Sequence, residues 1–165
     1  MNDRDTFEFL RGIAPDLQLV KGDFDVDAPN LPLSKVVTPG APNTPGAAVP
    51  PTSSSTNTNA GAAGNATGLR IGFTHGHTIV PTADPDALLI AARQMDVDVL
   101  LWGGTHKFEA YELEGRFFVN PGSATGAFTT YGGGKEEIVP SFCLMDVWLF
   151  ASPLFYLFLV LSLLI

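Results

Sequence analysis

The chain has one cysteine, Cys143, among its 165 residues. An internal disulfide needs two cysteines, so this fold cannot depend on a disulfide framework. Small secreted domains commonly do depend on one, and the single thiol is therefore compatible with a reducing compartment. The amino-terminal run MNDRDTFEF also lacks the charged-then-apolar layout of a secretory signal peptide. Nothing at that end predicts secretion.

Basic residues are scarce as well. The chain has nine lysines and arginines and seventeen aspartates and glutamates, which gives a formal net charge of −8. Proteins that bind nucleic acid concentrate positive charge on one face. We therefore expect no nucleic-acid partner.

Two segments lack what an ordinary core requires. Residues 39–68 are rich in Pro, Gly, Ser, Thr, Asn and Ala and have no large apolar side chains, so they predict a disordered low-complexity insertion. Residues 148–165 contain no charged side chain. We expect one domain over 1–147 and a separate hydrophobic tail over 148–165.

The remaining sequence alternates helical and strand patterns. A helix is predicted over 3–14 from its amphipathic spacing, and a second over 85–95 because Asp84 can cap it and Pro85 suits its first position. The predicted strands are 17–20, 35–38, 69–74, 97–102, 110–113, 116–120 and 141–147. Glu114 and Gly115 predict the turn of a hairpin. This order favours an α/β fold.

Polar side chains follow three of these strands. Asp23, His75 and His106 each lie where a predicted strand finishes, and ligands gather at such ends in open α/β sheets. A carboxylate and two imidazoles suit manganese, iron or zinc. From spacing alone, structural or surface roles for these histidines remain an open alternative.

Four segments carry a resemblance to a known family. These are KGDFD, RIGFTHGH, VLLWGGTHKFEAYELEGRFFVNPGSATGAF and IVPSFCLMDV, in this order. Together they resemble the vacuolar protein sorting-associated protein 29 family, the small retromer subunit with a metallophosphoesterase-like fold. The resemblance implies a partial αββα sandwich, truncated at the amino terminus and divergent at the carboxyl terminus.

The chain departs from the pattern of metallophosphoesterase enzymes. Those enzymes hold two metal ions with several Asp, His and Asn ligands, and the first two ligand motifs would precede the start of this chain. Phe24 stands where the enzymes have the His near the leaving group, and Gly104 stands at another ligand position. The resemblance implies that Asp23, His75 and His106 are a vestigial set of metal ligands. A two-ion hydrolysis would lack a site and a general acid, so we expect no enzyme and no required cofactor, with weak Mn or Zn binding possible.

The resemblance implies a scaffold function instead. We expect a non-catalytic subunit of the retromer coat in endosome-to-Golgi retrograde transport, cytoplasmic and peripheral on the endosome membrane, which binds the large α-solenoid subunit and other retromer subunits. Ile79, Val80 and Pro81 follow the second ligand strand and are implied interface residues. The alternative is that Ile79 and Val80 cap the local core. A metal-dependent phosphoesterase and a non-functional or membrane-tethered fragment are the alternatives.

The tail admits three interpretations. Its length fits the lower end of a membrane-spanning helix, but it has no flanking basic residues that would favour an anchor. It would otherwise belong to a natural isoform or to a faulty gene model. We favour an alternative or faulty gene model because both ends depart from the family, and direct membrane insertion of 148–165 stays open.

Overall fold

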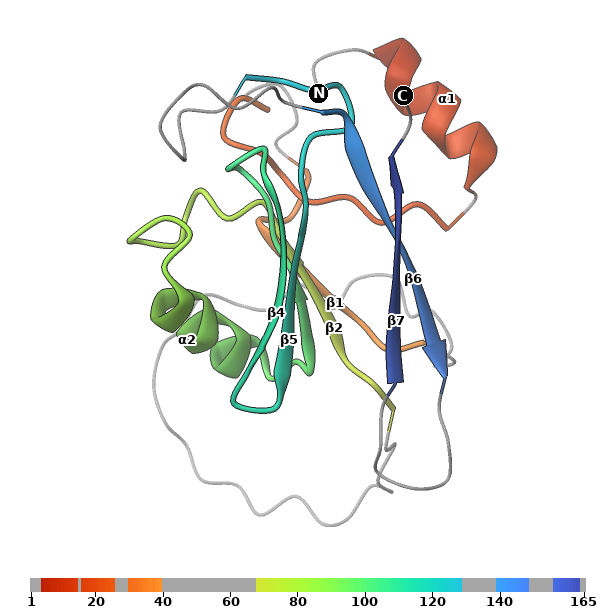
Figure 1. The fold of residues 1–165 in the computed structure, drawn as a ribbon. Coiled ribbons are helices and arrows are strands. Elements are labelled where there is room, and N and C mark those ends of the chain that lie inside the picture. Colours follow the sequence, from red (N-terminus) through yellow and green to blue (C-terminus); the bar gives the residue numbers. More distant parts are fainter. Residues whose placement is uncertain are drawn as a thin grey trace.

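The computed structural model describes residues 4–14, 16–25, 30–39, 68–128, 139–148 and 156–163. Two helices and seven strands occur in these ranges (Figure 1). They are α1 (Arg4–Ile13), β1 (Ser34–Val37), β2 (Ile71–Thr74), α2 (Pro85–Met95), β3 (Val99–Leu101), β4 (Phe108–Leu113), β5 (Arg116–Pro121), β6 (Ser141–Trp148) and β7 (Tyr156–Leu163).

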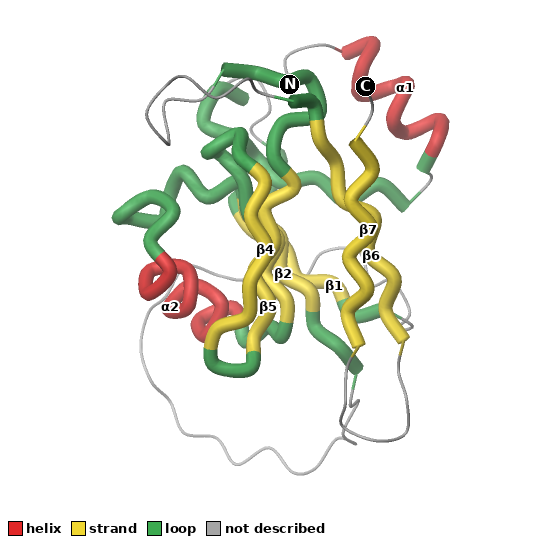
Figure 2. The backbone as a smooth tube through the Cα atoms, in the orientation of Figure 1, coloured by secondary structure: helices red, strands yellow, loops and turns green. Residues whose placement is uncertain are grey.

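Five strands form the main sheet in the order β1-β2-β3-β5-β4. β2, β3 and β5 are parallel, whereas β1 and β4 are antiparallel edge strands. The carboxyl ends of the three parallel strands therefore lie at the same edge of the sheet. Figure 2 shows loops gathered at that edge, opposite the tight turn between β4 and β5. This arrangement positions the candidate site.

Local capping explains why α2 begins and ends where it does. The Asp84 side chain accepts a hydrogen bond of 2.8 Å from the backbone N–H of Ala87, and Pro85 occupies the first turn, where its missing N–H costs nothing. Asp96 ends the helix in a left-handed conformation, with φ of 52°. The predicted helix over 85–95 is confirmed with the same bounds.

Each face of the main sheet packs against a different layer. On one face, Leu88 and Ala92 of α2 pack with Leu100 of β3 and Phe118 of β5 in one buried cluster. On the other face, a second cluster formed around β2 and β3 contacts Met145 of β6. The order of layers is helix, sheet, sheet, as Figure 1 shows. The expected α/β fold is confirmed.

The second sheet contains β6 and β7, paired antiparallel from Ser141 opposite Leu163 to Trp148 opposite Tyr156. A strand thus occupies 156–163, whereas the anchor interpretation of the tail needed a helix there. The backbone groups of 156–163 pair with β6, so the structure has a strand and not a helix at these positions. Within the described ranges, neither helix has the length and apolarity required to cross a bilayer. Residues 149–155 and 164–165 lie outside the described part of the chain.

The predicted strand over 17–20 is wrong. In the described structure these residues do not pair with any strand. The first backbone hydrogen bond after them is donated by the N–H of Lys21 to the carbonyl of Pro32, at 2.8 Å. A strand requires a neighbouring strand to satisfy its backbone groups, so apolar alternation alone is insufficient. The predicted low-complexity insertion over 39–68 falls outside the described residues except at its two ends.

Candidate functional site

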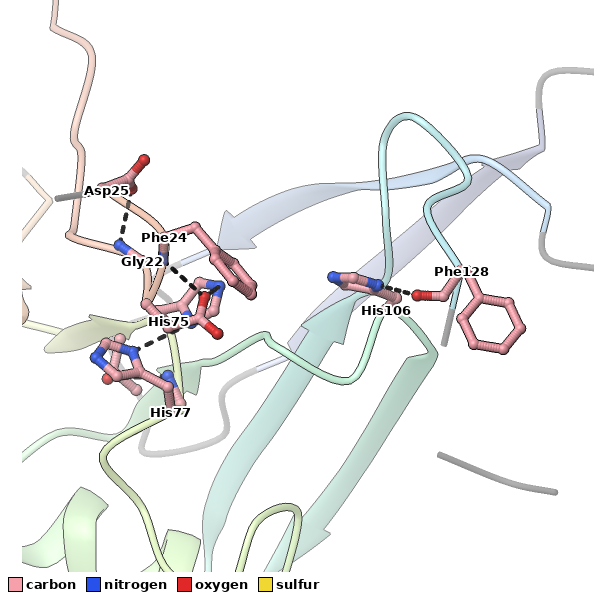
Figure 3. A network of polar contacts seen from close by, with 10 residues as sticks. Gly22, Phe24, Asp25, His75, His77, His106 and Phe128 are labelled. Carbon is pink, nitrogen blue, oxygen red and sulfur yellow. Dashed lines mark hydrogen bonds and ion pairs between the residues drawn. The ribbon is translucent and has the colours of Figure 1, made fainter. Parts of the chain in front are cut away.

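The candidate site is a cavity of about 360 Å³ at the carboxyl edge of the main sheet. Its walls come from the turn before β1, the loop after β2 and the loop after β3. The lining residues are Val20, Gly22, Asp23, Phe24, Asp25, His75, Gly104 and His106. Figure 3 is a close-up of this region, in which His75 and Phe24 lie on one side of the cavity and His106 lies on the other.

Two of these loops touch through their backbones. The N–H of Gly103 donates to the carbonyl of His75 at 3.2 Å. A Cβ on Gly76 would lie 2.7 Å from the carbonyl oxygen of Gly103, and one on Gly104 would lie 3.1 Å from that of His75. Both glycines have positive φ, 95° and 88° respectively. This close approach therefore favours glycine at both positions.

The turn that carries Asp23 is held by its own side chains. Asp25 Oδ2 accepts a hydrogen bond of 2.9 Å from the N–H of Gly22, and Asp23 Oδ1 accepts one of 3.1 Å from the N–H of Phe24. Aspartate side chains commonly bond nearby backbone groups in this way and so stabilise tight turns. Phe24 is nevertheless 84 % exposed. The turn presents an aromatic ring at the rim of the cavity.

Asp23 and His75 are brought together as predicted. Asp23 Oδ1 lies 3.8 Å from His75 Nε2, and His75 Nδ1 lies 3.2 Å from Nδ1 of His77. One of the two Nδ1 atoms must carry a proton for that contact to be a hydrogen bond. Burial lowers the pKa of His75, and the Asp23 carboxylate opposes this shift. His75 therefore links a carboxylate to a second imidazole.

His106 lines the same cavity but has a different partner. Its Nδ1 lies 2.6 Å from the backbone carbonyl of Phe128, and only a protonated nitrogen can bond a carbonyl oxygen. Figure 3 shows this contact on the opposite side of the cavity from His75. The predicted set of Asp23, His75 and His106 is thus divided into a pair and a separate histidine.

This arrangement does not fit a two-ion centre. Among the residues that the structure describes, no three His, Cys, Asp or Glu side chains are grouped so that they could hold a metal ion. Gly104 adds no ligand, and the close backbone contact fills the space around its Cα. A two-metal mechanism needs ligands for both ions. Asp23 and His75 form a carboxylate–imidazole pair, with 3.8 Å between Oδ1 and Nε2.

The three residues of the predicted interface loop differ in their exposure to solvent. Val80 is 81 % exposed and Pro81 is also exposed, whereas Ile79 is partly buried against the cluster beneath α2. Core capping, the alternative raised from the sequence, therefore describes Ile79 but not Val80. Ile79 fixes the loop, and Val80 projects from it.

Two residues of the site were missed by the sequence analysis. The position of His77, two residues after His75 in the run THGH, was a usable signal because both side chains follow one strand. Phe128 carried no such signal. It lies 22 residues from His106 and reaches it through a loop contact that no local pattern encodes.

Residues 2–147 match the calcineurin-like phosphoesterase superfamily domain. The chain is 44 % identical over 142 residues to vacuolar protein sorting-associated protein 29 from Schizosaccharomyces pombe, covering 86 % of this chain and 61 % of that protein. It thus spans about six tenths of that curated relative.

Two solved structures are similar over nearly the whole chain. Vps29 from Chaetomium thermophilum is 42 % identical with a TM-score of 0.67, covering 98 % of this chain and 77 % of that one. Wild-type Vps29 from Entamoeba histolytica, solved as a complex with Zn²⁺, is 30 % identical with a TM-score of 0.66, at coverages of 98 % and 77 %. The chain therefore belongs to the vacuolar protein sorting-associated protein 29 family and has a calcineurin-like phosphoesterase fold.

Proposed function

We propose that this chain is a non-catalytic scaffold subunit of the retromer coat, which acts in endosome-to-Golgi retrograde transport. Its direct partner is the large α-solenoid subunit, and through it the other retromer subunits. The chain is then cytoplasmic and peripheral on the endosome membrane. Family membership supports this assignment, and the net charge of −8 argues against a nucleic-acid partner.

The observation that carries the proposal is the exposure of Val80. An aliphatic side chain that is 81 % exposed on a loop gains free energy when a partner covers it, about 1.5–3 kcal/mol for complete burial. Because Ile79 packs against the core, the loop is anchored before any partner binds. Such preorganisation lowers the entropy cost of association. Val80 and Pro81 therefore suit a protein interface.

The replacement of a histidine by Phe24 supports the proposed lack of catalysis. Asp23 and His75 form a carboxylate–imidazole pair, and Phe24 beside them can neither donate nor accept a catalytic proton. Proton transfer to a leaving group needs a titratable side chain within hydrogen-bond reach. We propose that the scaffold function requires no metal and that Asp23 and His75 bind Mn²⁺ or Zn²⁺ only weakly.

Copurification with the large subunit tests the interface. We expect the unaltered chain to bind and Val80→Asp to abolish binding, because the substitution places a charge in the apolar contact. Ile90→Asp is the matched control, since Ile90 is an exposed aliphatic residue on α2. Equal binding by Val80→Asp and the unaltered chain would disprove the assigned surface.

A metal-dependent phosphoesterase is the second candidate. It is favoured by the Asp23–His75 contact of 3.8 Å and by the Entamoeba histolytica relative that was solved with Zn²⁺. A phosphatase assay with manganese separates the two functions. Turnover that disappears in His75→Ala would establish the enzyme, whereas no turnover above a metal-only blank supports the scaffold.

A further inference from the structure

We propose that the groove between α1 and β1 binds an extended, acidic peptide segment of a protein partner, which pairs as a strand with residues 17–20. The groove is a cavity of about 310 Å³, at the lower end of the size range of ligand pockets. Side chains from α1, from residues 17–19 and from residues 31–35 line it. Figure 1 shows α1 lying above the segment that leads from it toward β1. This inference does not depend on the proposed scaffold function, because Val80 does not line the groove.

The side chains of residues 17–20 alternate as those of a strand do. Leu17 and Leu19 line the groove, whereas Val20 lines the cavity of the candidate site. Successive side chains of an extended chain point to opposite sides. The segment therefore has the side-chain arrangement of a strand, although it pairs with no strand in the described structure.

The backbone of this segment is available for pairing. In the described ranges, the N–H groups of Gln18, Leu19 and Val20 donate to no carbonyl. The next N–H, that of Lys21, bonds to the carbonyl of Pro32 and so holds the segment beside the start of β1. Unpaired backbone groups favour the addition of a strand, which supplies N–H and C=O groups in register. An acyl chain has no such groups, so a peptide is the occupant that fits.

Two cations determine the charge of the groove. Arg11 and Lys35 line it, and neither forms an ion pair in the described ranges. The side chains of Arg70 and Arg93, by contrast, are each paired with a carboxylate. An acidic side chain on the partner complements the two free cations, even though the chain as a whole has a net charge of −8. The occupant then has an acidic side chain facing this pair and aliphatic side chains facing the two leucines.

Fluorescence polarisation with a labelled synthetic peptide tests the groove. The probe is GLTVTETG, whose leucine, valine and glutamate share one face of a strand. We expect saturable binding with a Kd below about 1 mM. The control peptide GLTVTKTG has lysine in place of the acid and is expected to bind at least about fivefold more weakly. Absence of saturable binding by the acidic peptide in this range would overturn the proposal.

Two N-methylated forms of the acidic peptide test the strand pairing. One has N-methyl groups on its leucine, valine and glutamate, and the other has them on its threonines. Alternate N–H groups of a strand point to opposite edges, so only one form loses the donors that face residues 17–20. We expect that form to bind at least about tenfold more weakly and the other to stay within about twofold of the parent. Equal weakening in both forms, or in neither, would exclude pairing as a strand.

Charge reversal in the chain locates the bound peptide. Arg11→Glu is expected to weaken binding of the acidic peptide and to strengthen binding of the lysine peptide, because the interaction changes sign. Lys107→Glu is the matched control, since it changes the net charge equally at a residue that does not line the groove. Circular dichroism melting verifies that each variant is folded. The same effect in both variants would assign the difference to net charge and overturn the groove.

The outcomes separate this inference from the proposed function. Failure of the peptide to bind would overturn the groove and leave the Val80→Asp copurification test unaffected. Arg11→Glu is expected to copurify with the large subunit as well as the unaltered chain does. Loss of copurification in Arg11→Glu would place the groove within that interface, and would overturn the assignment of a separate partner.

Discussion

The side-chain amide of Asn120 donates a hydrogen bond of 2.9 Å to the hydroxyl of Thr105, and both residues are buried. Asn120 lies near the end of β5, whereas Thr105 belongs to the loop after β3 that carries Gly104 and His106. Asn120 also accepts a bond of 3.0 Å from the N–H of Gly122. One buried amide thus fixes two loops at the edge of the candidate site.

Removing that amide is expected to destabilise the fold. Asn120→Ala leaves the N–H of Gly122 without this acceptor, and an unsatisfied buried group costs about 1–3 kcal/mol. We predict a decrease of this size in the free energy of unfolding measured by urea denaturation. Thr105→Val removes the other end of the bond, so the double variant should lose less than the sum of the two. Strict additivity would show that the two residues act independently.

Gly104 offers a test of the close contact between loops. Gly104→Ala places a Cβ 3.1 Å from the His75 carbonyl oxygen and in a backbone with φ of 88°. Gly115→Ala is the matched control, because Gly115 has φ of 71° but nothing lies within 4 Å of its Cβ position. Left-handed backbone strain alone costs about 1–2 kcal/mol. We therefore predict a loss near that value for Gly115→Ala and a larger one for Gly104→Ala in urea denaturation. Equal losses would exclude a steric contribution from His75.

His75 should give the stability a dependence on pH. Burial lowers its pKa in the folded state below the ordinary value of 6.5. Below pH 6.5 the unfolded chain then binds a proton that the folded chain does not, so stability falls as the pH decreases. Above pH 6.5 the contribution is fully present.

The measurement compares the unaltered chain with His75→Asn across this range. The variant keeps a polar group but removes the titration. We expect the difference between their free energies of unfolding to change as the pH falls through 6.5 toward the lowered pKa of His75. A constant difference across that window would show that burial does not disfavour the charged form.

Local chemistry made part of the fold predictable. Asp84 and Pro85 predicted the start of α2, and Glu114 and Gly115 predicted the β4–β5 turn, because capping and turn geometry depend on a few adjacent residues. The predicted strand over 17–20 failed for the opposite reason. Its apolar residues are suited to a strand, but a strand exists only with a partner, and the partner is not a local property.

The candidate site shows the same limit. Each strand end was predicted to present a polar side chain, and the structure places Asp23, His75 and His106 around one cavity. Which of them interact was not predictable, because the contact between His106 and Phe128 depends on how the loop after β5 folds back. The pairing of β6 with β7 could not be predicted from the sequence either, since the apolar run over 148–165 is compatible with a helix or a strand.

Divalent metal binding provides the last prediction. We expect isothermal titration with Zn²⁺ to detect at most one weakly bound ion, held by Asp23 and His75, because the described residues contain no group of three ligands. His75→Ala should remove this binding, whereas His106→Ala should leave it nearly unchanged, since Nδ1 of His106 bonds Phe128 instead.

The contrast between those two histidine variants decides the ligand set. Equal losses in His75→Ala and His106→Ala would require the loop after β3 to move until His106 joins the pair, and would thus restore a three-ligand site. Binding that survives in both would place the ion elsewhere on a chain with seventeen acidic residues. Only a selective loss in His75→Ala agrees with a cavity in which His106 holds Phe128 and the remaining pair retains a residual affinity for metal.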